Sequence, residues 1–113
     1  MKHRLAVMLL LTFFGVALTR ADDKPKALAL AAPRVIKLPE ASRLHLEGTG
    51  VFAVEVDKAS GKVTAVKVRQ STGERLLDTS AIEGLQKWRF RPQIVTRVII
   101  PVTFTANSDA AQY

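Results

Sequence analysis

The sequence predicts an α+β fold, in which a three-stranded antiparallel sheet carries one helix packed on a face. Two runs of alternating apolar and polar residues, 51–57 and 62–70, flank a short turn and are typical of a β-hairpin. A segment with helical spacing follows the hairpin, and a third alternating run completes the pattern. With 113 residues, the chain is expected to form a single domain.

Residues 1–21 are typical of a secretory signal peptide. Lys2 and Arg4 precede the apolar stretch 5–18, and the small residue Ala21 stands at a suitable cleavage position. The apolar stretch is shorter than the roughly 20 residues that a membrane-crossing helix needs. We therefore expect export with removal of the signal, and retention as a short membrane anchor is the alternative.

Residues 22–38 are expected to be a linker that leads into a domain over residues 39–106. Pro25 and Pro33 bracket an Ala/Leu run that is too short to form a stable helix by itself. After Pro39, the residues 41–46 are expected to form one or two helical turns.

The first two strands form the predicted hairpin. In the first, one face carries Phe52, Val54 and Val56. The residues 57–61 supply the turn, and Gly61 suits a positive φ there. In the second strand, Val66 lies on the apolar face, which it shares with Val68, and the polar face carries Lys67 and Arg69.

An amphipathic helix is predicted to start near Arg75, because one apolar stripe recurs at spacings of four, four and three: Leu77, Ala81, Leu85 and Trp88. We interpret Trp88 as a core anchor rather than a peptide-stacking residue. Asp78 suits the start of the helix, where an acid is favourable. Gly84 lowers the stability of a helix by about 1 kcal/mol relative to Ala, and a close approach of the helix to the sheet would explain it.

The third strand is expected over residues 95–105, with one apolar face made of Val98, Ile100, Val102 and Phe104. A single helix between the second and third strands returns the chain parallel to the second strand. In an antiparallel sheet the third strand must then pair with the first, which gives the order 2-1-3. The third strand is therefore an edge, and Pro101 agrees because proline is confined to edges or bulges. An exposed edge can accept a strand from another chain.

Composition excludes several classes of function. The net charge is +7, but the bases are scattered among acids, which favours a solvated surface over a nucleic-acid site. Cysteine is absent, and His45 is the only histidine after the signal, so neither a disulfide nor a metal site is expected. No cofactor is implied. Because no acid, histidine or nucleophile pair is suitably placed, we do not expect an enzyme. The tail over residues 107–113 is polar and small and is expected to be flexible.

Several short motifs, in order and at matching spacing, resemble the C-terminal domain of the TonB family of energy transducers. They are Pro39 with Ala41, Glu47 to Gly50, Val54 to Asp57, Gly61 to Val63, Ser71 to Gly73, Leu77 with Asp78, Ala81 with Ile82, Trp88 to Phe90 with Pro92, and Val102 to Phe104. The resemblance implies a periplasmic domain whose sheet edge captures an extended peptide, the TonB box of an outer-membrane transporter.

Carried onto this sequence, the resemblance implies a peptide-binding edge strand that consists of Arg97, Val98, Ile99, Ile100, Val102, Thr103 and Phe104. The motif adjoining that site would be Phe90, Arg91 and Pro92. The resemblance also implies energy-coupled transmembrane transport driven by an inner-membrane motor complex, ExbB and ExbD.

Two features of the family's transducers are not matched in this sequence: a membrane helix with a motor-contacting histidine, and a long Pro-rich spacer. We therefore expect the motor contact to come through another protein. An alternative hypothesis is a structural module of the cell envelope that forms a homodimer through its edge strand, without energy transduction.

Overall fold

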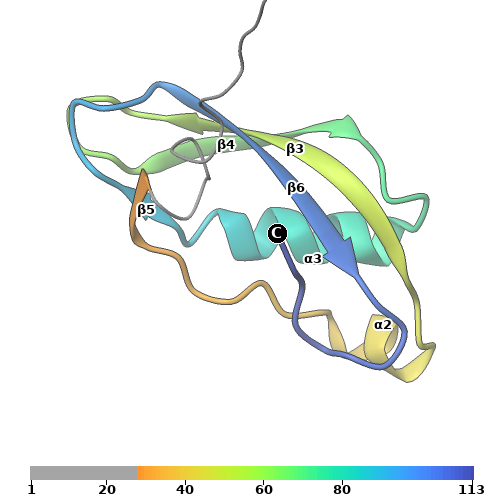
Figure 1. The fold of residues 1–113 in the computed structure, drawn as a ribbon. Coiled ribbons are helices and arrows are strands. Elements are labelled where there is room, and N and C mark those ends of the chain that lie inside the picture. Colours follow the sequence, from red (N-terminus) through yellow and green to blue (C-terminus); the bar gives the residue numbers. More distant parts are fainter. Residues whose placement is uncertain (1–27) are drawn as a thin grey trace, which may run out of the picture.

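The computed structural model describes residues 28–113, and Figure 1 shows their arrangement. The predicted signal peptide and the first part of the predicted linker lie outside the described residues. In chain order the elements are β2 (Ala29–Ala31), α2 (Pro39–Arg43), β3 (Gly48–Val56), β4 (Val63–Gln70), α3 (Arg75–Leu85), β5 (Arg89–Phe90) and β6 (Arg97–Phe104).

The main sheet has three antiparallel strands in the order β4-β3-β6, which confirms the predicted order 2-1-3. The turn between β3 and β4 is closed by a 2.7 Å hydrogen bond from the Gly61 amide to the Asp57 carbonyl. Gly61 has a φ of 81°, as predicted. A side chain at Gly61 would also collide with the Phe90 carbonyl, since a Cβ built there lies 2.0 Å from that oxygen.

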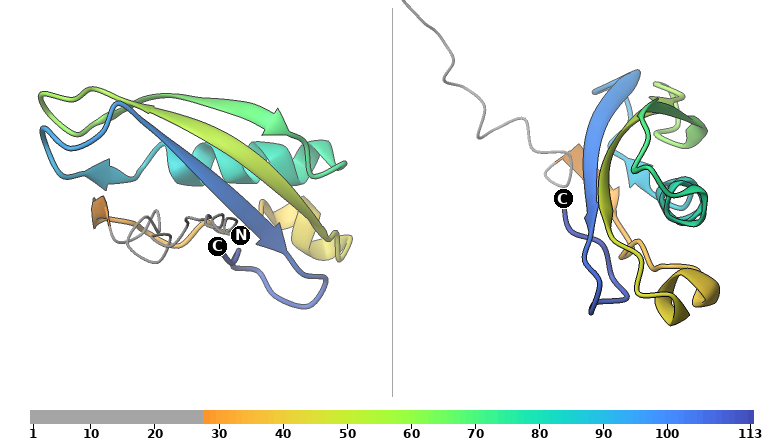
Figure 2. Two further views of the ribbon diagram at one scale, coloured as in Figure 1. Left: turned by 45° about the horizontal axis from the view of Figure 1, so that its top comes forward. Right: turned by 90° about the vertical axis from the view of Figure 1, so that its right-hand side faces the viewer.

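The core lies between one face of the sheet and α3 (Figure 2). Its fully buried large side chains include Phe52 and Val54 from β3, Leu77 and Leu85 from α3, and Ile100 from β6. Burial of each such side chain contributes about 1.5–3 kcal/mol. The alternation of apolar residues in β3 and β6 therefore predicted the correct core face of both strands.

Helix α3 begins at Arg75 as predicted, but it ends at Leu85, before the last residue of the predicted stripe. Trp88 lies in the turn beyond the helix, where its amide donates to the Leu85 carbonyl over 3.1 Å. The indole is fully buried, and its Nε1 donates to the Pro33 carbonyl over 3.0 Å. Trp88 is therefore a core anchor, as predicted, although it is not part of the helix.

The prediction of a linker over residues 22–38 is wrong for the residues from 28 onward. β2 pairs with β5 in a second, two-stranded sheet, and the Val35 side chain is fully buried. Gly84 makes this packing possible, because a Cβ at that position would lie 2.9 Å from both Val35 methyl groups. The close neighbour of Gly84 is thus the N-terminal segment rather than the sheet.

The C-terminal tail (residues 107–113) also differs from the prediction, because it folds back along the domain instead of fraying. The amide and carbonyl of Gln112 exchange two 2.8 Å hydrogen bonds with those of Thr103. Ala110 and Ala111 are each only 8% exposed, and the Tyr113 ring lies 5.3 Å from the Trp88 ring. The small side chains of Ala110 and Ala111 allow the tail to pack closely against the rest of the domain. Figure 2 shows the tail beside β6, on the side away from β3.

Candidate functional site

The predicted site is the edge of β6 that faces away from β3, and its backbone pattern follows from two contacts. Thr103 directs its amide and carbonyl outward, since both are bonded to Gln112. The Thr96 carbonyl points inward, because it accepts from the Val56 amide of β3. Along a strand, the backbone amide and carbonyl of one residue point to one side, and those of the next residue point to the other side. The outer edge of β6 is therefore formed by the backbone groups of Arg97, Ile99, Pro101 and Thr103.

These four residues are not equally available to an added strand. The Thr103 groups are held by the tail, and Pro101 has no N–H to donate. Within residues 28–113, the amides and carbonyls of Arg97 and Ile99 have no backbone partner, and neither has the Pro101 carbonyl. The available edge thus begins at the N-terminal end of β6 and is interrupted before Thr103.

The seven predicted edge residues divide into two groups in the structure. Four of them have side chains that are at most 6% exposed and belong to the core: Val98, Ile100, Val102 and Phe104. Arg97, Ile99 and Thr103 lie on the other face of the sheet, and the Ile99 side chain is 43% exposed. A ligand at the edge could therefore contact the side chains of only the second group.

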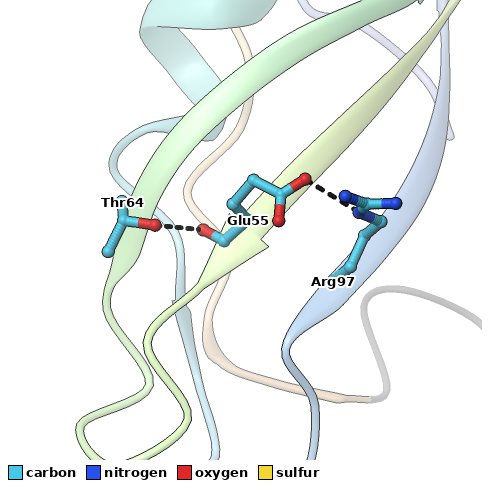
Figure 3. A network of polar contacts seen from close by, with 3 residues as sticks. All are labelled: Glu55, Thr64 and Arg97. Carbon is cyan, nitrogen blue, oxygen red and sulfur yellow. Dashed lines mark hydrogen bonds and ion pairs between the residues drawn. The ribbon is translucent and has the colours of Figure 1, made fainter.

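A small polar network fixes the start of β6 against β3 (Figure 3). The Arg97 Nε lies 2.8 Å from the Glu55 Oε2, and the Glu55 carbonyl accepts from the Thr64 hydroxyl over 3.3 Å. The Arg97 side chain is 56% exposed, so this ion pair contributes at most about 1 kcal/mol to stability. Its main effect is to direct the guanidinium toward Glu55 of β3.

The predicted motif Phe90, Arg91 and Pro92 does not form one exposed surface. The Phe90 side chain is fully buried, with its ring 6.1 Å from the Trp88 ring. The Phe90 amide donates to the Gly61 carbonyl over 2.8 Å, and the Arg91 amide donates to the Leu28 carbonyl over 3.2 Å. Phe90 is thus bonded to the turn between β3 and β4, and Arg91 is bonded to the residue just before β2. Only Arg91 and Pro92 are exposed to a ligand.

The other edge of the sheet is formed by β4. Its pairing with β3 has two register shifts, and its exposed residues include Lys67 and Arg69. Irregular pairing and exposed charges both hinder the addition of a further strand. The β6 edge is therefore the better candidate for strand addition.

Among the titratable groups of the described residues, Asp78 has a perturbed pKa, and its contacts explain the shift. Partial burial acts to raise the pKa of this carboxyl, but hydrogen bonds from the Ser71 hydroxyl, the Thr72 amide and the Thr72 hydroxyl lower it below its ordinary value. These bonds hold the loop before α3. Residues 28–113 contain no group of histidines and acids that could bind a metal ion.

Residues 39–107 match the model of the family described as Gram-negative bacterial TonB protein C-terminal. The chain belongs to this TonB C-terminal family. Protein TonB of Xanthomonas campestris pv. campestris (strain B100) is 37% identical over 75 residues, which cover 61% of this chain and 33% of that protein. Protein TonB of Vibrio cholerae serotype O1 is 32% identical over 89 residues, which cover 73% of this chain and 35% of that protein.

The chain spans about a third of the length of the curated TonB relatives that it matches. No solved structure matches it. The part that matches the TonB family includes α2, the main sheet, α3 and β5, but it leaves out β2 and residues 108–113. In the part of the chain that the structure describes, no helix has the length and apolar character required for a membrane span.

Proposed function

We propose that this TonB-family chain is a periplasmic module that binds the TonB box of an outer-membrane transporter by strand addition to β6. The carrying observation is the row of outward backbone groups at Arg97, Ile99 and Pro101, which have no backbone partner within residues 28–113. Membership of the TonB C-terminal family supports the same proposal.

In this proposal the peptide gains affinity mainly from backbone hydrogen bonds to Arg97 and Ile99. Each bond contributes about 0.5–1.5 kcal/mol net, so a few of them give modest, reversible binding. The Ile99 side chain, which is exposed beside those groups, offers an apolar contact to the peptide side chain that lies opposite it on the same face.

The module would support energy-coupled uptake by linking a transporter to an inner-membrane motor complex. In this proposal the contact with the motor complex comes through another protein of the system. This domain would then be the peptide-binding part of that system.

Replacement of Ile99 by Pro tests the proposal directly. The Ile99 amide faces outward, so the substitution removes a donor from the peptide site without removing a bond to β3. We expect a synthetic TonB-box peptide to shift the backbone amides of β6 in the isotope-labelled protein, and to bind the Ile99→Pro variant about tenfold more weakly. Ile99→Ala is the matched control, because it alters the side chain and keeps the amide.

Unchanged affinity in a folded Ile99→Pro variant would show that the edge is not the site. If dilution of the protein without peptide shifts the same amides and lowers the mass measured by light scattering, a second copy of the chain occupies the edge. That result would favour the homodimeric envelope module over the peptide reader.

A further inference from the structure

We propose that residues 109–113 of the C-terminal tail are a built-in competitor for the β6 edge, and that a long peptide must displace them to pair with the whole strand. This inference rests on the proposed function of β6 as the peptide site. It adds that the site has two forms. With the tail bonded to Thr103 the site is short, and with the tail released it extends to Thr103.

The tail already occupies the place of an added strand. The Gln112 amide donates to the Thr103 carbonyl and the Thr103 amide donates to the Gln112 carbonyl, each over 2.8 Å. These two residues form an antiparallel bridge, as they would in a regular sheet. An incoming peptide that paired with Thr103 would need the same two backbone groups, so the peptide and the tail exclude each other at this position.

The other side of the tail is held by the N-terminal segment. The Ala111 amide donates to the Val35 carbonyl over 2.8 Å, and the Lys37 amide donates to the Asp109 carbonyl over 2.7 Å. The Lys37 side chain is buried, and its ammonium donates to the Thr105 carbonyl over 2.6 Å at the turn that leads into the tail. The tail therefore lies between β6 and residues 35–37. Loss of its hydrogen bonds to either neighbour would make the tail easier to displace.

The length of a peptide determines whether it competes with the tail. Because Pro101 has no donor, the edge that remains with the tail in place offers full backbone pairing only at Arg97 and Ile99. A peptide of about five residues covers that part without reaching Thr103, since strands pair residue by residue. A peptide of about nine residues reaches Thr103 and meets the tail. Competition should therefore depend on peptide length.

Gln112→Pro tests the competition, because it removes the donor to the Thr103 carbonyl, and Gln112→Ala is the matched control that keeps it. We would titrate the protein and both variants with synthetic TonB-box peptides of about five and nine residues. We expect Gln112→Pro to bind the longer peptide about tenfold more tightly than the unmodified protein does, because less of the site is closed. The shorter peptide should bind all three proteins equally.

A second measurement uses the unmodified protein and does not depend on the folding of a variant. With a saturating amount of the longer peptide, hydrogen exchange at the Gln112 amide should accelerate at least tenfold, because its bond to Thr103 is lost. The shorter peptide should leave that exchange rate unchanged.

The outcomes separate this inference from the proposed function. If the longer peptide binds at β6 with equal affinity in every variant and leaves the Gln112 amide protected, the tail is no competitor, although β6 remains the peptide site. If neither peptide binds any of the folded proteins, the proposed function fails and the competition fails with it. Tighter binding by Gln112→Pro with both peptides alike would also contradict the inference, because the effect would not come from Thr103.

Discussion

At the scale of single residues, Asp78 shows how one carboxylate organises the loop before α3. It accepts hydrogen bonds from both the amide and the hydroxyl of Thr72, over 2.9 Å and 2.7 Å, and a third bond from the Ser71 hydroxyl. These donors favour the ionised form, which explains why the pKa of Asp78 is lowered despite partial burial. The sequence placed Asp78 near the helix start, and the structure identifies the loop as its partner.

The lowered pKa gives Asp78 a pH-dependent contribution to stability. Because the pKa is lower in the folded than in the unfolded protein, the contribution is complete above the unfolded pKa, near 3.8, and is lost as the pH falls through the folded pKa. We expect Asp78→Asn to reduce the free energy of unfolding by about 1 kcal/mol at pH 7, the usual net contribution of a hydrogen bond.

Urea unfolding of the protein and the Asp78→Asn variant between pH 7 and pH 2.5 measures this difference. The two free energies should run parallel above about pH 5 and converge below the unfolded pKa, because the native carboxylate becomes protonated there. A difference that stays constant down to pH 2.5 would mean that the contribution of Asp78 does not depend on its charge.

At the scale of elements, the contact between α3 and the N-terminal segment depends on Gly84. Alanine would favour the helix by about 1 kcal/mol. Its Cβ, however, would lie 2.9 Å from both Val35 methyl groups and 3.1 Å from the Val35 Cα. Overpacking of this kind costs about 1–3 kcal/mol. We therefore expect Gly84→Ala to lower the free energy of unfolding by about 1 kcal/mol, as measured by urea titration.

A double-mutant cycle with Val35→Ala tests this explanation, since it removes the two methyl groups that the new Cβ would meet. In the Val35→Ala background that overpacking is relieved and the helix preference for alanine remains, so Gly84→Ala should raise the free energy of unfolding by about 1 kcal/mol. This corresponds to a coupling energy of about 2 kcal/mol. An equal effect of Gly84→Ala in both backgrounds would instead indicate that its consequence is local to the helix.

The elements also show which parts of the fold a sequence can predict. The hairpin, the start of α3 and the inward face of β6 follow from local alternation and helical spacing, so they were predicted correctly. The partners of Gly84, Trp88 and Phe90 are distant in sequence and leave no periodic signal. The tail was misjudged for the same reason, because Ala110 and Ala111 gain their burial from neighbours such as Val35.

The position of β6 at the edge of the sheet was predicted correctly, whereas its role as a peptide site stays a prediction. The order of the strands identified β6 as an edge, and Pro101 was consistent with that position. Which backbone groups point outward depends on the register with β3, and which of them are available depends on the tail. Neither the register nor the position of the tail is encoded in β6 itself. The sequence could therefore predict the strand, but it could not divide its seven residues into edge and core.

At the scale of the whole molecule, the fold extends beyond the part that matches the TonB family. Residues 39–107 contain the main sheet and α3, but the described flanks close the core from outside that part. Val35 covers Gly84, the Pro33 carbonyl accepts from the Trp88 indole, and the Tyr113 ring lies on the Trp88 ring. The two flanks also bond to each other, between the Val35 carbonyl and the Ala111 amide.

We therefore expect a fragment of residues 39–107 to be much less stable than residues 28–113. Loss of the buried Val35 side chain removes about 1.5–3 kcal/mol, and loss of the ring contact on Trp88 removes about 0.5–1.5 kcal/mol more. The free energy of unfolding in urea should fall by at least about 2 kcal/mol, which is a large share of the stability of a domain this small. The emission of Trp88, the only tryptophan, should shift to the red because water reaches its ring.

Fragments that lack one flank each, residues 39–113 and 28–107, make this test specific. Because the flanks bond to each other, removing either one should also weaken the contacts of the other. The decreases in the free energy of unfolding of the two single truncations should therefore sum to more than the decrease measured for residues 39–107. Strictly additive losses would mean that the flanks stabilise the core independently. Equal stability of residues 39–107 and 28–113 would show that the family-matched part folds without them, and that the tail is only a cover for the β6 edge.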